Sequence, residues 1–304
     1  MGLLSLELIF DNPQRTFFSG QTLTGRLMVR TDAPKNLRSI VIKFKGEAHV
    51  HWTGTEILPS GEHYYPFSMI LPHHLPSSFE GDYGYIRYTV KAILDRPWKF
   101  DHEAKAAFTV LSHVDLNIDP QNRVPTKREK LKTFCCCCCK SGPLTLVTII
   151  PAQGFVPGQH VPITVEVDNV SNVNINHYIR FHATSPPKTK QQHVTVQKVV
   201  LEGEVHENDS RTWAQNFTIP PLPPSQLREC RIIDLEYLIK IPITIGTIPL
   251  WEAPPSYEEC MYGTDSIGDS DDNQHVIGIT SYKPRYPTYN LSAPPPAYPG
   301  LVPK

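Results

Sequence analysis

The chain has 304 residues, which is long enough for two ordinary domains with a substantial core. Its 29 Lys and Arg residues against 30 Asp and Glu residues give a formal net charge of -1, so it lacks the basic excess typical of proteins that bind nucleic acid. It also contains 30 prolines, and one proline inside a helix costs about 3 kcal/mol, which excludes a fold of long helices.

Apolar residues recur with a period of two along the chain until its composition changes after Leu250. The clearest alternating runs are residues 4 to 10, 22 to 30, 40 to 45, 87 to 92 and 161 to 168. One apolar and one polar face on each strand are typical of sheets that pack in a sandwich. Turn residues separate the runs at short intervals, so we predict an all-β fold of antiparallel sheets.

The chain also repeats two markers in the same order. A Gly-Gln pair opens an alternating strand at Gly20-Gln21 and again at Gly158-Gln159. Later, a strand ends in a proline-rich corner at residues 67 to 77, and a similar strand and corner occupy residues 217 to 225. We interpret these markers as two copies of one β-sandwich. The alternative is chance recurrence of common turn residues.

These patterns divide the chain into four predicted parts. Residues 1–122 and 143–250 form two tandem immunoglobulin-like β-sandwiches, residues 123–142 form a basic, cysteine-rich connection, and residues 251–304 form a disordered tail rich in Pro and Tyr. Disorder is expected for the tail because stretches such as residues 265 to 272 carry too little apolar surface to offset their ordering entropy.

The cysteines and the first residues of the chain indicate the cellular compartment in which the protein is expected. Five of the seven cysteines are consecutive, at residues 135 to 139, which provides no spaced disulfide framework of the kind that secreted domains use. Glu7 and Asp11 come too early for a signal peptide, and no apolar run reaches the roughly 18 residues of a membrane span. We expect a soluble, cytoplasmic protein.

The sequence contains no motif that predicts catalysis. It lacks a glycine-rich phosphate loop, a Gly-x-Ser-x-Gly turn and a His-Glu-x-x-His helix. His73 and His74 are adjacent, and neighbours on a strand point to opposite faces, so they chelate a metal poorly. The cysteine run lacks the spacing of zinc ligands. We therefore predict no enzymatic activity, no cofactor and no metal.

The predicted tail carries two Pro-Pro-x-Tyr motifs. Consecutive prolines favour the extended polyproline II helix, so little entropy is lost when an aromatic-lined groove such as that of a WW domain binds them. The tyrosine then fills a second pocket. The predicted WW-binding residues are Pro254, Pro255, Tyr257, Pro295, Pro296 and Tyr298. The alternative is that a tail rich in Pro and Tyr produces such tetrapeptides by accident.

The whole pattern resembles one family. Two tandem sandwiches with Gly-Gln strand openings, the segment IPITIGTIPL at residues 241 to 250 and a tail that begins APPSYEEC at residue 253 are similar to the arrestin-domain-containing proteins, or α-arrestins. The resemblance implies arrestin-like sandwiches that engage membrane receptors or transporters as cargo. It also implies that the tail recruits HECT-type ubiquitin ligases through their WW domains, which promotes ubiquitination and endocytosis or endosomal sorting at the plasma membrane and endosomes.

Three other functions compete with this interpretation. An arrestin-like sorting scaffold would bind cargo without needing the ligase. A β-sandwich carrier would hold a small apolar ligand in an internal cavity, and a hydrolase is the least supported of the three. Loss of function on removal of both tail tyrosines would distinguish the ligase adaptor from the scaffold.

The sequence departs from the family near its second sandwich. Residues 234 to 250 should contain two strands, but no Gly, Asn or Ser lies between Leu235 and Thr244 to form the turn. This favours a shortened isoform or an incomplete gene model, and it questions whether the second sandwich is intact.

The cysteine run suggests a lipid modification. Cysteines flanked by basic residues in a membrane-proximal adaptor are candidates for S-acylation, because the lysines would be attracted to anionic lipid. The candidates are Cys135, Cys136, Cys137, Cys138 and Cys139. Alternatively, the run is an apolar strand of small residues.

Overall fold

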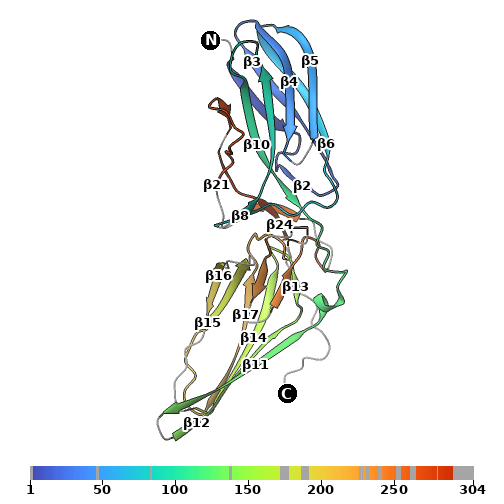
Figure 1. The fold of residues 1–304 in the computed structure, drawn as a ribbon. Coiled ribbons are helices and arrows are strands. Elements are labelled where there is room, and N and C mark those ends of the chain that lie inside the picture. The colour runs from blue at the N-terminus through green and yellow to red at the C-terminus, as the bar shows by residue number, and fades with distance from the viewer. Residues whose placement is uncertain are drawn as a thin grey trace. The chain divides into compact units, whose positions relative to one another are not determined.

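A computed structural model provides the three-dimensional structure of the chain. It describes residues 3–45, 48–82, 84–136, 139–171, 178–185, 192–225, 227, 229–230, 233–238, 242–250, 255–260, 265–278 and 280–289. These residues fall into two compact units (Figure 1). The first unit comprises Met1–Ser112 and Tyr257–Tyr286, and the second comprises His113–Ser256 and Pro287–Lys304.

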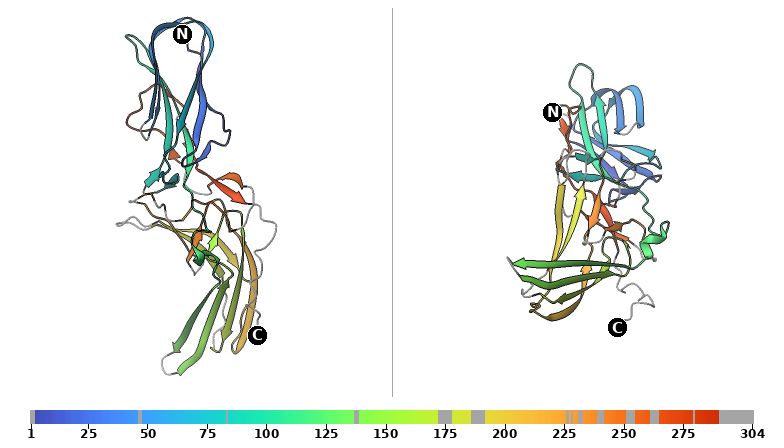
Figure 2. Two further views of the ribbon diagram at one scale, coloured as in Figure 1. Left: turned by 90° about the vertical axis from the view of Figure 1, so that its right-hand side faces the viewer. Right: turned by 60° about the horizontal axis from the view of Figure 1, so that its bottom comes forward.

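The first unit is a sandwich of two sheets, which Figure 2 shows as separate layers. One sheet has the order β1-β3-β6, formed by β1 (Ser5–Phe10), β3 (Thr22–Thr31) and β6 (Gly61–Ile70). The other has the order β2-β10-β9-β4-β5, formed by β2 (Thr16–Phe18), β10 (His102–Leu111), β9 (Tyr88–Asp95), β4 (Lys35–Phe44) and β5 (Ala48–Leu58). A short hairpin, β7 (Phe79–Gly81) and β8 (Gly84–Ile86), follows the proline corner.

The predicted alternation places the core of this sandwich. On β1, Leu6, Leu8 and Phe10 are buried, while Glu7 between them is exposed. The Phe10 ring lies 6.0 Å from the ring of Phe108 on the facing sheet, so aromatic side chains join the two layers. The start of the first alternating run differs from the prediction, because Leu4 precedes β1 and is exposed.

The second unit is also a two-sheet sandwich. Its first sheet has the order β11-β12-β14-β17, formed by β11 (Thr126–Cys136), β12 (Cys139–Ile150), β14 (His160–Asn169) and β17 (Asp209–Thr218). Its second has the order β13-β19-β18-β15-β16, formed by β13 (Gly154–Phe155), β19 (Pro242–Ile245), β18 (Glu236–Leu238), β15 (Tyr178–Ser185) and β16 (Gln192–Val200). A short 3-10 helix, η1 (Pro120–Arg123), precedes β11.

Both structural repeats predicted from the Gly-Gln pairs are present. Gly20 and Gly158 adopt left-handed backbone conformations, with φ of 84° and 83°, which glycine tolerates without steric cost. The side-chain Oε1 of the glutamine that follows accepts a hydrogen bond from the backbone N–H three residues earlier, at 2.9 Å for Gln21 and 3.1 Å for Gln159. The two turns are therefore the same local structure, formed once in each sandwich.

The two proline-rich corners are also equivalent in detail. The Tyr88 hydroxyl donates to the Pro76 carbonyl oxygen at 2.8 Å, and the Tyr237 hydroxyl donates to the Pro223 carbonyl oxygen at 2.7 Å. Tyr88 lies on β9, which comes after the β7–β8 hairpin that follows the first corner, and Tyr237 lies on β18. The same pair of contacts confirms that the sequence repeat reflects two copies of one sandwich.

The hairpin that seemed difficult to place in the second sandwich is present. Strand β18 pairs antiparallel with β19, with Tyr237 opposite Ile243 and Leu238 opposite Pro242. β18 ends at Leu238 and β19 begins at Pro242, so these strands have only three and four residues. A turn residue such as glycine is therefore not needed inside either strand. The buried side chains of Tyr237, Ile243 and Ile245 fix the pair to the core.

The segment expected to connect the sandwiches, residues 123 to 142, is mostly strand. Its residues form β11, the edge strand of the second unit, which pairs with β12. The basic residues that suggested a connection, among them Lys127, Lys130 and Lys132, are exposed along this edge. Lysines on an edge strand prevent pairing with other chains, which gives the basic stretch a structural reason.

Part of the predicted tail of residues 251 to 304 also forms structure. Its short strands are β20 (Pro255–Glu259), β21 (Asp265–Ser266), β22 (Val276–Ile277), β23 (Ser281–Tyr282) and β24 (Arg285–Tyr289). β20 pairs with β24, β21 pairs with β23, and β22 adds to β10 of the first sandwich in parallel orientation. We call the part of this tail that belongs to the first unit, Tyr257–Tyr286, the docked segment.

Candidate functional site: the docked segment and its motif

The structure describes part of the first Pro-Pro-x-Tyr motif. Pro255 and Tyr257 lie in β20, and Tyr257 is the first residue of the docked segment. Pro254 and the whole second motif, Pro295, Pro296 and Tyr298, lie outside the described residues. The site can therefore be described around Tyr257 and the residues of the first unit that contact it.

Tyr257 packs into a small apolar cluster of the first unit. Leu111, Cys260 and Tyr286 form its buried part, and Phe18 and Tyr257 pack against them while partly buried. Burial raises the pKa of the Tyr257 phenol above its usual value. We call these five residues the tyrosine cluster.

Backbone and hydroxyl contacts hold the tyrosine cluster in place. The Cys260 N–H donates to the Pro284 carbonyl oxygen at 2.8 Å, which joins the two ends of the docked segment. The Tyr286 side chain is only 1% exposed, and its hydroxyl donates to the Ser78 carbonyl oxygen at 2.9 Å. A buried tyrosine with a satisfied hydroxyl contributes both apolar burial and a directional bond to the docking.

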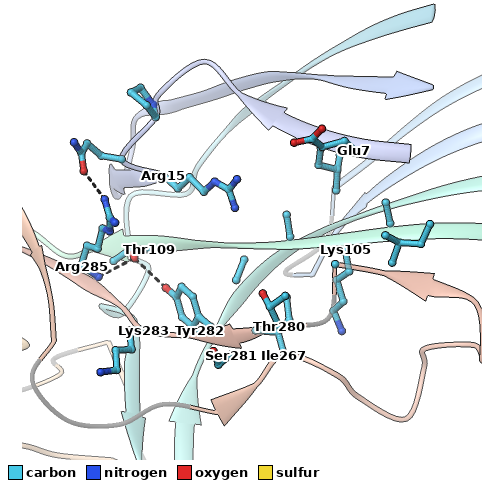
Figure 3. Close-up of a pocket in the computed structure, with 18 of the residues that line it drawn as sticks. Glu7, Arg15, Lys105, Thr109, Ile267, Thr280, Ser281, Tyr282, Lys283 and Arg285 are labelled. Carbon is cyan, nitrogen blue, oxygen red and sulfur yellow. Dashed lines mark hydrogen bonds between the residues drawn. The ribbon is translucent and has the colours of Figure 1, made fainter. Parts of the chain in front are cut away.

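A second tyrosine fixes the segment to β10. The Tyr282 hydroxyl donates to the Phe108 carbonyl oxygen at 3.0 Å and lies 3.0 Å from the Thr109 hydroxyl oxygen, which accepts from the Arg285 N–H (Figure 3). Burial raises the pKa of Tyr282 to about 12. The phenol therefore stays protonated and remains a donor throughout the physiological range.

An ion cluster forms the other end of the docking surface. The Lys105 side chain, 2% exposed on β10, lies 2.9 Å from Asp269 and 2.8 Å from Asp272 of the docked segment. Lys45 adds a contact of 2.6 Å to Asp269. Burial opposes ionisation of Asp269, but hydrogen bonds from Lys45 and Lys105 outweigh it and hold the pKa of this carboxyl well below its usual range.

A third lysine extends the ion cluster across the neighbouring strand. Lys91 on β9 lies 3.0 Å from Glu103 and 3.1 Å from Asp272. Burial opposes its charge, yet the hydrogen bonds to these two carboxylates raise the pKa of Lys91. Lys91 and Lys105 are thus almost buried cations that the acidic residues of the segment neutralise, and removing one partner of such a pair is costly.

A buried ion pair between Arg87 and Glu80 also contacts the docked segment. Two nitrogens of Arg87 donate to the two carboxylate oxygens of Glu80, at 2.5 and 2.7 Å, in a bidentate arrangement. A third nitrogen donates to the Ser266 carbonyl oxygen of the docked segment at 2.7 Å. The first sandwich therefore holds the segment by backbone contacts as well as by charge.

One glycine allows the segment to approach β10 closely. Gly278 has φ of 89°, and a Cβ atom built on it would lie 2.5 Å from the Lys105 carbonyl oxygen. Only glycine fits this contact without displacing backbone. It lies next to the parallel pairing of β22 with β10, so Gly278 lets the segment add to the sheet.

A polar pocket of about 570 Å³ lies between β1 and the docked segment. Figure 3 shows Glu7 and Arg15 on one side and Lys283 and Arg285 on the other. Both signs of charge line the pocket, together with the hydroxyl of Tyr282. It lies beside the docking contacts, and its lining of both charges selects no single charge of ligand.

The candidate acylation residues lie around a hairpin turn. Strand β11 ends at Cys136 and β12 begins at Cys139, which pair with each other, while Cys135 pairs with Lys140. Cys137 and Cys138 lie outside the described residues. The cysteines are thus at the end of a β-ladder whose exposed edge is basic.

Other kinds of site are lacking in the parts of the chain that the structure describes. These residues contain no cluster of three or more His, Cys, Asp or Glu side chains that could hold a metal. No helix among them has the length and apolar character needed to cross a membrane.

Sequence reasoning missed the docked segment. Residues 251 to 304 were predicted to form a disordered tail, yet Tyr286 is 1% exposed. The available signal was the apolar residues spaced among the polar ones, such as Ile267. These apolar residues recur with no period of two or 3.6, so their spacing predicts neither a strand nor a helix.

Comparisons with known proteins agree with this architecture. Residues 6–57 and 53–117 match the family model for the N-terminal domain of arrestin, or S-antigen, and residues 140–253 match the model for its C-terminal domain. The chain is 33% identical to arrestin domain-containing protein 17 of Caenorhabditis elegans, over 80% of this chain and 70% of the relative. It is 27% identical to human arrestin domain-containing protein 4, over 81% of this chain and 72% of the relative. It is also 27% identical to human arrestin domain-containing protein 1, over 84% of this chain and 67% of the relative.

Proposed function

The chain belongs to the arrestin-domain-containing proteins, a family of trafficking adaptors, and we propose that it links membrane-protein cargo to WW-domain HECT-type ubiquitin ligases. The two sandwiches engage receptors or transporters, and the two Pro-Pro-x-Tyr motifs recruit the ligase. Cargo is then ubiquitinated and endocytosed or sorted at endosomes. The observation that carries the proposal is the presence of two such motifs directly after two arrestin sandwiches.

The chemistry of the motifs supports this role. A WW groove accepts a proline pair in the polyproline II conformation together with one aromatic anchor, and both motifs contain these groups. Tyr257 and Tyr298 lie in one chain segment, so a ligase with several WW domains can bind both motifs at once. Such bivalent binding raises the overall affinity through effective concentration.

The direct test is binding of the full chain to a tandem WW fragment of a HECT ligase. Tyr257→Ala and Tyr298→Ala each remove an aromatic anchor, and loss of such an anchor costs about 2 kcal/mol or more at its own site. We expect the double variant to lose measurable binding. Ser256→Ala changes only the variable position of the first motif and is the matched control. Equal binding by the wild type and the double variant would refute the proposal.

The competing function is a sorting scaffold that needs no ligase. The assay that separates the two follows the cell-surface level and ubiquitination of a bound cargo in cells that express the wild type or the double tyrosine variant. The adaptor loses its effect on cargo with the double variant, whereas a scaffold retains it.

Peripheral membrane association through the cysteine run belongs to the same proposal. Acyl chains on cysteines at the end of the β11–β12 ladder would lie beside exposed lysines, so two weak membrane signals would act together. Hydroxylamine-sensitive acyl labelling of the wild type, lost when all five cysteines are changed to serine, is the expected result. Labelling that persists in the five-serine variant would refute this part.

A further inference from the structure

The described part of the first motif is paired with another strand, whereas a WW domain binds its ligand as a single extended segment. WW grooves accept the polyproline II helix, which is extended, has no internal hydrogen bonds and leaves its backbone solvated. In the structure, Pro255–Glu259 is strand β20 and pairs with β24. Pairing with a partner strand is incompatible with a ligand that must lie alone in a groove.

The anchor side chain of the motif is also occupied. Tyr257 is half-buried against the tyrosine cluster, whose members Leu111 and Tyr286 are 0% and 1% exposed. A WW domain must insert the same ring into its own pocket. The two contacts therefore exclude each other, because one aromatic ring cannot be buried in two places.

The docked segment makes several further contacts with the sandwich. Tyr286 and Tyr282 bond to backbone carbonyls of the sandwich, and Asp269 and Asp272 neutralise the nearly buried Lys105. The segment also buries Ile267, which is 4% exposed. Apolar burial, buried hydrogen bonds and compensated charge all favour the docked state over a free tail.

We propose that the N-terminal sandwich sequesters the first Pro-Pro-x-Tyr motif by binding the docked segment, so that this motif is available to a WW domain only when the segment is released. The inference rests on the proposed function and adds regulation of its first binding site. The sandwich and the WW domain are then competitors for Tyr257. Any event that releases the segment increases the number of WW domains that one chain can bind.

The size of the effect follows from the population of the released state. The apparent Kd of the motif equals its intrinsic Kd divided by the released fraction. A segment that is released about a tenth of the time therefore weakens WW binding about tenfold. We expect the described contacts to weaken WW binding by about this factor or more.

The experiment measures binding of a single WW domain to the full chain carrying Tyr298→Ala, which leaves only the first motif. The reference ligand is a free peptide of residues 251 to 264, which contains the same motif without the docking contacts. We expect the chain to bind at least about tenfold more weakly than the peptide. Equal affinities would overturn the inference.

Two variants on the segment itself should restore binding while leaving the sandwich sequence unchanged. Asp269→Asn with Asp272→Asn removes the partners of Lys105, and Gly278→Val introduces the clash with its carbonyl oxygen. Both should raise the affinity toward that of the peptide. Asp271→Asn removes the same charge from an exposed side chain and is the matched control, which should change nothing.

Release can be measured without a WW domain. Cys260 is 3% exposed, so its alkylation, followed by mass spectrometry of the cysteine-containing peptide, reports the undocked state. We expect faster alkylation of Cys260 in the two release variants and no change at Cys230 of the second unit. Unchanged alkylation of Cys260 together with unchanged WW binding would contradict the docking.

The outcomes separate this inference from the proposed function. Failure of the free peptide, and of a matching peptide around Tyr298, to bind any WW domain would refute the proposed function. Binding of the peptide together with equal binding of the Tyr298→Ala chain would refute only the sequestration. A release variant that raises the affinity of both motifs equally would also refute it, because the docked segment contains only Tyr257.

Discussion

The two sandwiches share their corners but differ in the pair of strands that begins with the corner tyrosine's strand. In the first unit, β9 and β10 have 8 and 10 residues, whereas the corresponding β18 and β19 of the second unit have 3 and 4. The longer β10 carries Lys105 and Thr109, to which the docked segment binds. The repeat thus sets the common fold, and β10 of the first sandwich provides side chains that bind the docked segment.

The largest expected effect comes from the two separate cores, which equivalent phenylalanines occupy. Phe67 and Phe217 precede equivalent corners and are 4% and 3% exposed. Replacing either with Ala should destabilise its own sandwich by about 3–5 kcal/mol, because a large cavity replaces a buried ring. Hydrogen exchange resolved along the chain in increasing denaturant measures each unit separately. Ser68→Ala, at an exposed neighbour, is the control, and equal loss in both units from one substitution would contradict two separate cores.

The corner tyrosines should give the next largest effect. Tyr88→Phe and Tyr237→Phe each remove a hydroxyl that donates to a proline carbonyl oxygen. An unsatisfied buried acceptor costs about 1–3 kcal/mol in the free energy of unfolding, and Tyr237 should cost more because it is 1% exposed against 8% for Tyr88. Chemical denaturation of the two variants tests this order. No loss at either position would show that the shared corner does not stabilise the fold.

The two glutamine turns should differ although their bonds are the same. Gln159 is 2% exposed, whereas Gln21 is exposed. Gln159→Ala leaves a backbone N–H unsatisfied in the interior, at a cost of about 1–3 kcal/mol, while water replaces the lost bond in Gln21→Ala, at a cost within about 0.5 kcal/mol. Thermal unfolding of the two variants tests this difference. Equal losses of stability in the two variants would mean that burial does not determine how much this hydrogen bond stabilises the fold.

Acid should destabilise the first sandwich through His102. Burial, together with the nearby charges of Arg96, Lys35 and His275, lowers the pKa of His102 to about 4. The unfolded chain therefore binds this proton first, and stability falls as the pH decreases from about 6.5 to about 4. His102→Gln should flatten the pH dependence of unfolding of the first unit over this range. His206→Gln, at an exposed histidine of the second unit, is the control, and an unchanged slope in His102→Gln would contradict the prediction.

The sequence predicted those features of the fold that depend on residues close together in the chain. Period-two alternation, the Gly-Gln turns and the proline corners each involve residues within a few positions, and all of them appear in the structure. The β18–β19 hairpin was misjudged because two very short strands need no turn residue inside the alternating run. The edge strand β11 was mistaken for a connection because its exposed lysines resemble those of a linker.

The docked segment could not be predicted in this way. Lys105 pairs with Asp272 across 167 positions, and neither residue alone indicates a partner. The acidic stretch lacked the apolar content that predicts folding, but its carboxylates compensate lysines already placed by β9 and β10. A segment that becomes ordered by binding to a folded domain can have the amino-acid composition of a disordered segment.

The most direct test of this account is hydrogen exchange of the full chain over the docked segment. The account predicts protection of amides between residues 257 and 286, in particular Cys260, whose N–H bonds to the Pro284 carbonyl oxygen. It also predicts that this protection is lost in the Asp269→Asn, Asp272→Asn double variant, while the core strands of both sandwiches keep theirs. Complete exchange of the segment at the earliest time in the wild type would contradict the account, because the first motif would then be permanently free.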